Sequence, residues 1–192
     1  MNSIPLQVIG VASFLGTLLA LWIGRSAPAT RGAILRIDRI GIGLAALLAS
    51  LALVVACFAG LWQVIARFAT GTPAIWSEAL VRTALIWMAM LGLAMALRAG
   101  ALVSIDVAHR YSHGALRRGL QAVALFANWL LMGVLFWFGW SMALRVRFQE
   151  MAGLEVPMSW GYAAIPAGAL LAILGALGHF LDHRSTELEN AV

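Results

Sequence analysis

The chain has 192 residues, of which 62% are hydrophobic and 11% charged, and its formal net charge is +5. The apolar residues form runs longer than the roughly 18 residues that indicate a membrane span, which excludes an ordinary soluble domain. These runs do not alternate as the strands of a transmembrane barrel do, so we predict an all-α, polytopic transmembrane helical bundle. The basic side chains are all arginines between the apolar runs, which favours a role in membrane topology over nucleic-acid binding.

Five apolar segments are predicted in chain order, at 5–24, 40–65, 77–98, 119–146 and 160–181. The first lacks the basic n-region of a secretory signal peptide, so we expect a retained extra helix, with a cleaved signal as the alternative. The other four form the core spans. The predicted divisions are an N-terminal helix with a basic connection (1–35), a four-span membrane domain (36–183) and a short polar tail (184–192).

Small residues recur at helical spacing within two of the core segments. Such stripes allow helices to pack closely in lipid, where no hydrophobic driving force brings them together. Cys57 lies in the second segment and is predicted to be a small core residue. The stripes are Ala45, Ala49, Ala52, Ala56 and Gly60 in the second segment, and Ala163, Ala167, Ala172 and Ala176 in the fifth.

The arginines are distributed unequally between the two sides of the predicted bundle. The positive-inside rule places the richer side in the cytoplasm, which predicts a periplasmic N-terminus and a cytoplasmic C-terminus. We expect the segment near 99–118 to lie on the cytoplasmic membrane surface, with a plain linker as the alternative. The richer side has Arg25, Arg31, Arg36, Arg39, Arg98, Arg110, Arg117, Arg118 and Arg184, and the other has Arg67, Arg82, Arg145 and Arg147.

The third segment begins with WSEALVR, residues 76–82, where an acid and a base lie beside a long apolar run. Glu78 and Arg82 are four residues apart with the acid first, which is the favourable order on a helix. Glu78 also lies near the positive end of the helix, and Ser77 is predicted as the N-cap. Trp76 suits the aromatic belt at a membrane interface. Local helix structure therefore accounts for the pair, and contact with another subunit remains open.

No pattern in the sequence predicts an enzyme. His109 and His113, like His179 and His183, share a helical spacing, but a zinc site needs at least a third protein ligand. We therefore predict no catalytic residue, metal or cofactor. Two alternatives stay open: a haem-carrying membrane anchor of an oxidoreductase, and a small autonomous transporter. The latter is disfavoured because the span interiors carry almost no charge.

Two groups of residues resemble the small permease subunit (DctQ-like) of tripartite ATP-independent periplasmic (TRAP) transporters. That family has an arginine, then Trp-x-Glu-Glu-x-x-Arg and a later His-Ile-x-Val-Asp, and near its last span Pro-x-Ser-x-x-Tyr with Ile-Pro. The resemblance covers about residues 36–182, but Ala79 replaces the second acid and Leu102 the histidine. The matching residues are Arg67, Trp76, Glu78, Arg82, Trp87, Gly92, Arg98, Asp106, Pro157, Ser159, Tyr162, Ile165 and Pro166.

The resemblance implies a non-catalytic subunit in a bacterial inner membrane. Its expected partners are a large elevator-type permease subunit, a periplasmic substrate-binding protein and membrane lipids, without nucleic acid. The complex would use a sodium gradient to take up an organic acid. The matching residues are candidates for subunit contact or are family-motif positions, and Glu78 and Arg82 are assigned to helix-start structure and subunit contact. Arg67, Arg145 and Arg147 are candidates for a periplasmic docking surface because they share the arginine-poor side.

Overall fold

The computed structural model describes residues 4–26, 28–69, 71, 74–100 and 115–189, without the side chains of residues 4, 23–26, 28–31, 115–118 and 183–189. Its helices are α1 (Ile4–Ser26), α2 (Pro28–Ala69), α3 (Ile75–Arg98), α5 (Ala115–Arg145), α6 (Ser159–Tyr162) and α7 (Ala164–Glu189). Within these ranges there is no β-strand, only an isolated bridge between Glu150 and Pro157. The predicted all-α bundle is confirmed.

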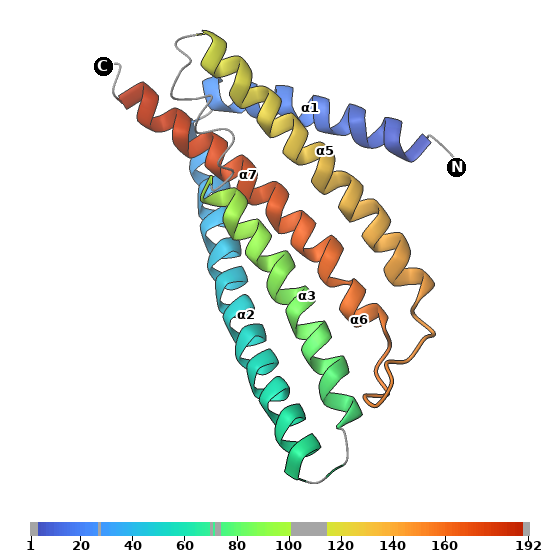
Figure 1. Cartoon of the computed structure of the whole chain (residues 1–192). Helices are drawn as coiled ribbons and strands as arrows, with labels where there is room; N and C mark the ends of the chain where they lie inside the picture. Colours follow the sequence, from blue (N-terminus) through green and yellow to red (C-terminus); the bar gives the residue numbers. More distant parts are fainter. Residues whose placement is uncertain (1–3, 27, 70, 72–73, 101–114, 190–192) are drawn as a thin grey trace.

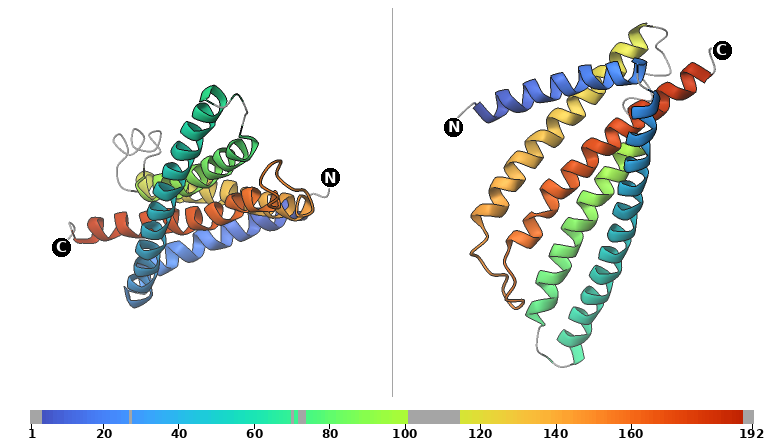
Figure 2. Two further views of the ribbon diagram at one scale, coloured as in Figure 1. Left: turned by 90° about the horizontal axis from the view of Figure 1, so that it is seen from below. Right: turned by 180° about the vertical axis from the view of Figure 1, so that it is seen from behind.

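Four long helices lie side by side in the order α2, α3, α7 and α5 (Figure 1). The last helix of the chain therefore lies between the third and fourth predicted spans. Helix α1 packs mainly against α5 and runs at a steep angle to α2, as two further views show (Figure 2). We name the two ends of the bundle after the ends of α3: the Trp76 end, where α3 begins, and the Arg98 end, where it finishes.

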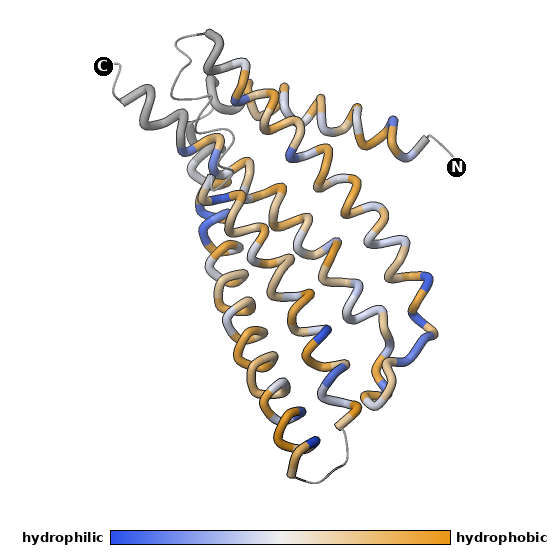
Figure 3. The backbone as a smooth tube through the Cα atoms, in the orientation of Figure 1, coloured by the Kyte–Doolittle hydropathy of each residue, from blue (hydrophilic) through white to orange (hydrophobic). Residues whose placement is uncertain are grey.

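Five described helices are long and apolar enough to cross a membrane, in agreement with the predicted number. Hydrophilic residues gather near the helix ends, while apolar residues fill the middle turns of α2, α3 and α7 (Figure 3). Many large apolar side chains point outward, which is the arrangement expected of a protein surrounded by lipid or by other membrane subunits. The candidate spans are Pro5–Trp22, Gly32–Ala69, Ile75–Arg98, Gly119–Arg145 and Ser159–Asp182.

The predicted small-residue stripe of α2 faces α3. Ala45 and Ala49 are buried and pack with Leu91 of α3, and the stripe continues through buried Ala56. Because alanine projects only a methyl group, α3 can approach along the whole stripe. Cys57, predicted to be a core residue, is exposed. It follows Ala56 by one position and therefore points about 100° around the helix, away from the interface.

Two glycines allow close contact between α7 and α3. A Cβ atom on Gly168 would lie 2.9 Å from the Met90 carbonyl oxygen, and one on Gly175 would lie 2.9 Å from the Ala94 carbonyl oxygen. The two glycines are seven residues apart, so they share one face of α7. The backbones of α3 and α7 therefore approach more closely than any larger residue would permit.

Some predicted boundaries differ from the observed ones. The second span was predicted to begin at residue 40, but α2 already begins at Pro28, so most of the predicted basic connection is helical. Proline is well suited to the first helical turn, and arginine is a good helix former, so charge did not mark a loop. The predicted surface segment near 99–118 lies mostly outside the described residues, although 115–118 belong to α5.

Candidate functional site

Helix α3 begins two residues before the predicted limit. Its N-cap is Ala74, without a side-chain capping hydrogen bond, so the prediction of Ser77 as N-cap is wrong. Ser77 is instead buried in the first turn, where its hydroxyl donates to the Ala74 carbonyl oxygen at 2.7 Å. Inside a helix a serine hydroxyl can donate to a carbonyl oxygen of the preceding turn, so Ser77 does not need the N-cap position to make a hydrogen bond.

The predicted pairing of Glu78 with Arg82 is confirmed. Arg82 Nη2 donates to Glu78 Oε1 at 2.8 Å, and both residues face the same side of α3. The Arg82 and Glu78 side chains are 69% and 60% exposed, so the pair contributes only about 0.3–0.5 kcal/mol to helix stability. Most of the hydrogen-bonding capacity of both groups is thus open to a neighbouring molecule.

The pair lines a pocket of about 250 Å³ between α3 and the segment 151–162. We call this the α3 pocket. Tyr162, which belongs to the second predicted motif, lies on the opposite wall, and Ala79 lies beside Glu78. The structure thus brings residues of both sequence motifs together around one pocket. This could not be read from the sequence, because the motifs are about eighty residues apart.

Two side-chain contacts fix the far wall of the α3 pocket against α3. The Thr83 hydroxyl lies 2.9 Å from the Ala79 carbonyl oxygen and 3.3 Å from the Met151 sulfur. The Trp87 indole donates to the Trp160 carbonyl oxygen at 3.1 Å. Trp87, a predicted motif residue, therefore anchors α6 to α3 through its indole N–H.

The segment between α5 and α6 folds back as a short hairpin. The backbone N–H of Met158 donates to the Gln149 carbonyl oxygen at 2.7 Å. Gly153 lies near the tip with a φ of 84°, and a Cβ atom there would lie 2.8 Å from the Trp76 backbone nitrogen. Glycine is required on both counts, since only it adopts this φ without strain and leaves room for the start of α3.

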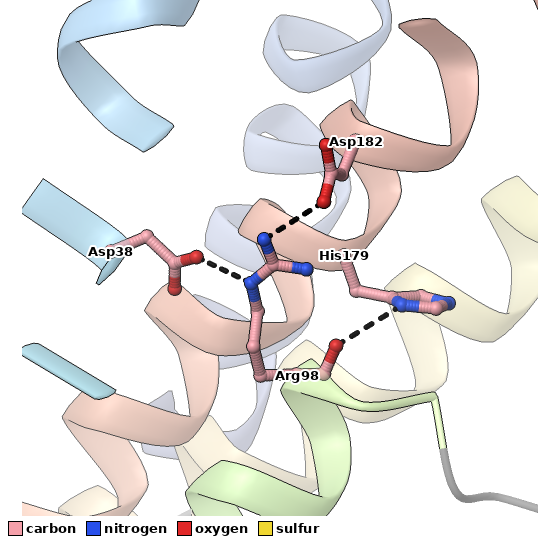
Figure 4. A network of polar contacts seen from close by, with 4 residues as sticks. All are labelled: Asp38, Arg98, His179 and Asp182. Atoms are coloured by element: carbon pink, nitrogen blue, oxygen red, sulfur yellow. Dashed lines mark hydrogen bonds and ion pairs between the residues drawn. The ribbon is translucent and has the colours of Figure 1, made fainter. Parts of the chain in front are cut away.

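A second polar centre lies at the Arg98 end and joins three helices (Figure 4). Arg98, the last residue of α3, donates from Nε to Asp38 Oδ2 of α2 at 2.5 Å and from Nη2 to Asp182 Oδ2 of α7 at 3.0 Å. His179 Nδ1 lies 3.2 Å from the Arg98 carbonyl oxygen, and it must be the donor because a carbonyl oxygen only accepts. We call these four residues the Arg98 network.

Asp38 is the buried member of the Arg98 network. Its side chain is 1% exposed, and its Oδ1 has no hydrogen-bond partner within the described part of the chain. The carboxylate lies against Gly178 of α7, where a Cβ atom would collide with it. Burying a carboxylate is costly unless a cation meets it, so Arg98 compensates the charge that α2 carries into the bundle. The network therefore fixes how α2, α3 and α7 meet.

The remaining predicted residues lie in several places. The three end arginines (Arg67, Arg145 and Arg147) are exposed and all lie at the Trp76 end, and the Arg147 guanidinium stacks over the Phe148 ring at 4.4 Å. Asp106 lies outside the described residues. Of the others, Gly92 lies within α3, Pro157 in the hairpin, Ser159 at the start of α6, and Pro166 buried near the start of α7.

Sequence reasoning missed Asp38 and Asp182 as partners of Arg98. Asp38 lies between Arg36 and Arg39, in the arginine-rich stretch just before the second predicted apolar segment. Its position two residues before the second predicted apolar segment was the available signal, because an acid at the edge of a span needs a cation. Within the described residues, no group of three His, Cys, Asp or Glu side chains could hold a metal ion.

Comparison with known proteins gives two similarities. The family model described as tripartite ATP-independent periplasmic transporters, DctQ component, matches residues 56–186. The sialic acid TRAP transporter small permease protein SiaQ of Vibrio cholerae serotype O1 is 27% identical over 116 residues, which cover 60% of this chain and 67% of that protein. The matched family range includes the α3 pocket, Arg98 and Asp182, but begins after Asp38.

Proposed function

Because the chain belongs to the DctQ component family of tripartite ATP-independent periplasmic transporters, we propose that it is the small subunit that scaffolds a large elevator-type permease. The chain is a transporter component and not an enzyme. In this proposal it takes part in sodium-driven uptake of an organic acid that a periplasmic binding protein delivers. The observation that carries the proposal is the family match across α3, α5, α6 and α7.

The packing of the bundle supports a stationary role. Glycines and alanines bring α2, α3 and α7 into close contact, and the Arg98 network joins the same three helices at one end. A subunit that remains fixed while its partner moves needs such a rigid arrangement, because packed interfaces do not deform continuously. Among the described residues, the charged groups of the spans lie near the helix ends (Figure 3). A scaffold that has no substrate path of its own needs no charge in the span interiors.

The arginine distribution supports an orientation. We propose that the Arg98 end faces the cytoplasm and the Trp76 end the periplasm, since most arginines flank the Arg98 end. The three end arginines would then face the periplasmic binding protein. The Glu78–Arg82 pair, predicted as a subunit contact, lies at the same end and is open to a neighbouring molecule.

The substrate class rests on the family and on one relative. SiaQ is described as part of a sialic acid transporter, and sialic acid is an organic acid. We propose an organic acid for this system as well. The selectivity would lie in the other subunits, because the α3 pocket of this chain combines one acid with one base and offers no excess positive charge for a carboxylate.

Co-purification with the large permease subunit tests the proposal. The full chain, tagged and co-expressed with its cognate large subunit, is expected to form a stable complex in mild detergent. A matched control is the tagged chain co-expressed with the large permease subunit of a different TRAP system. Recovery of the chain without its cognate subunit, at equal expression of both, would contradict the proposed function.

A further inference from the structure

We propose that the α3 pocket binds the headgroup of a zwitterionic phospholipid of the phosphoethanolamine class. The inference goes beyond the scaffold role, because it assigns a membrane ligand to a site within this chain. It also specifies what the exposed Glu78–Arg82 pair contacts in the membrane.

The position of the pocket suits a lipid headgroup. Trp76 and Trp160 are exposed at this end of the bundle, and exposed tryptophans prefer the membrane–water interface. Arg82 lies seven residues beyond Ile75, about 10 Å along the helix axis. Helical side chains lean towards the helix N-terminus, so the guanidinium reaches back to Glu78 at the level of the headgroups.

The charges of the pocket complement a zwitterion. Arg82 uses one N–H donor on Glu78 and retains others that suit phosphate oxygens. Glu78 Oε2 can accept from an ammonium group. Since Ala79 occupies the place of a second acid, the pocket charge is zero, namely −1 from Glu78 and +1 from Arg82. A lipid with a net negative charge brings a phosphate for Arg82 but no ammonium group for Glu78, so it would give the occupied pocket a net charge of −1.

The remaining lining and the volume of the pocket fit a headgroup and the adjoining part of a lipid. Ile75, Ile86, Met151 and Met158 provide apolar walls for the glycerol and the first methylene groups. Methionine side chains adapt readily to irregular ligands. The pocket, about 250 Å³, is smaller than the 300–1,000 Å³ typical of pockets that enclose drug-sized ligands, so the acyl chains would remain in the bilayer.

Native mass spectrometry of the purified full chain tests the proposal, with phosphatidylethanolamine, phosphatidylglycerol and inorganic phosphate as separate probes. The chain is expected to retain phosphatidylethanolamine in preference to the other two. Glu78→Gln and Arg82→Gln should each weaken this binding by about tenfold, as the loss of one charge-assisted hydrogen bond predicts. Arg67→Gln is the matched control, because Arg67 is exposed at the same end but does not line the pocket.

A second variant tests whether lipid binding needs the space inside the α3 pocket as well as the charges of Glu78 and Arg82. Ala79→Phe should fill the pocket while leaving Glu78 and Arg82 in place, and it should also abolish lipid retention, with circular dichroism showing an unchanged helix content. Equal retention of phosphatidylethanolamine and phosphatidylglycerol, or unchanged retention in Ala79→Phe, would overturn the proposal. Loss of the lipid when the large subunit binds, together with crosslinks from the pocket to that subunit, would also overturn the proposal, because the pocket would then be a protein contact.

Discussion

Arg98→Met removes the cation that joins α2, α3 and α7 while preserving the length and apolar stem of the side chain. Asp38 is then left buried with neither oxygen paired within the described residues, because its Oδ1 already lacks a partner. Breaking a buried ion pair costs about 3–5 kcal/mol. The Arg98 side chain is 26% exposed, so we expect the lower end of this range, a loss of about 3 kcal/mol in the free energy of unfolding.

Two further variants make the reasoning specific. Adding Asp38→Asn to Arg98→Met should recover at least half of the loss, because no buried charge then remains uncompensated. Asp182→Asn should cost less than about 1 kcal/mol, since the Asp182 side chain is 55% exposed and its pair is largely solvated. Unfolding by sodium dodecyl sulfate in mixed micelles, followed by circular dichroism, provides the free energies. A loss below about 0.5 kcal/mol for Arg98→Met, or an equal loss for Asp182→Asn, would refute the reasoning.

Three further predictions concern packing and transport. Gly175→Ala should destabilise the bundle by about 1–3 kcal/mol, because its methyl group meets the Ala94 carbonyl oxygen, whereas Gly43→Ala, which meets open space, should be neutral or stabilising in the same unfolding assay. Glu78→Gln combined with Arg82→Gln should slow uptake without changing substrate preference; altered preference in a competition assay would instead indicate a transport site. Charge reversal at the three end arginines should weaken uptake while the complex still purifies intact, and normal uptake by that triple variant would exclude them as a docking surface.

The sequence predicts the number of membrane spans well because lipid demands long apolar runs, and five of the described helices are long and apolar enough to cross a membrane. Local pairings are also predictable: Glu78 and Arg82 meet because helical geometry alone places residues four apart side by side. The residue at which a helix starts is less predictable. Ser77 offered a capping hydroxyl, but that hydroxyl is satisfied by a carbonyl of its own turn, and the helix begins earlier at Ile75.

Contacts between distant segments could not be predicted. Asp38, Arg98 and Asp182 meet only because α7 lies beside both α2 and α3, and nothing local to Asp38 indicates this arrangement. The same applies to the α3 pocket, whose two walls come from motifs that the sequence presents separately. The resemblance identified Tyr162 and Glu78 as motif residues, but only the structure places them around a common space.

Reconstituted uptake tests the scaffold account most directly. Proteoliposomes would contain the large subunit alone, this chain alone, or both, with the periplasmic binding protein, a labelled organic acid and an inward sodium gradient. The account predicts uptake only when both membrane subunits are present. Uptake by this chain alone, or full uptake by the large subunit without it, would contradict the claim that the chain is a necessary scaffold.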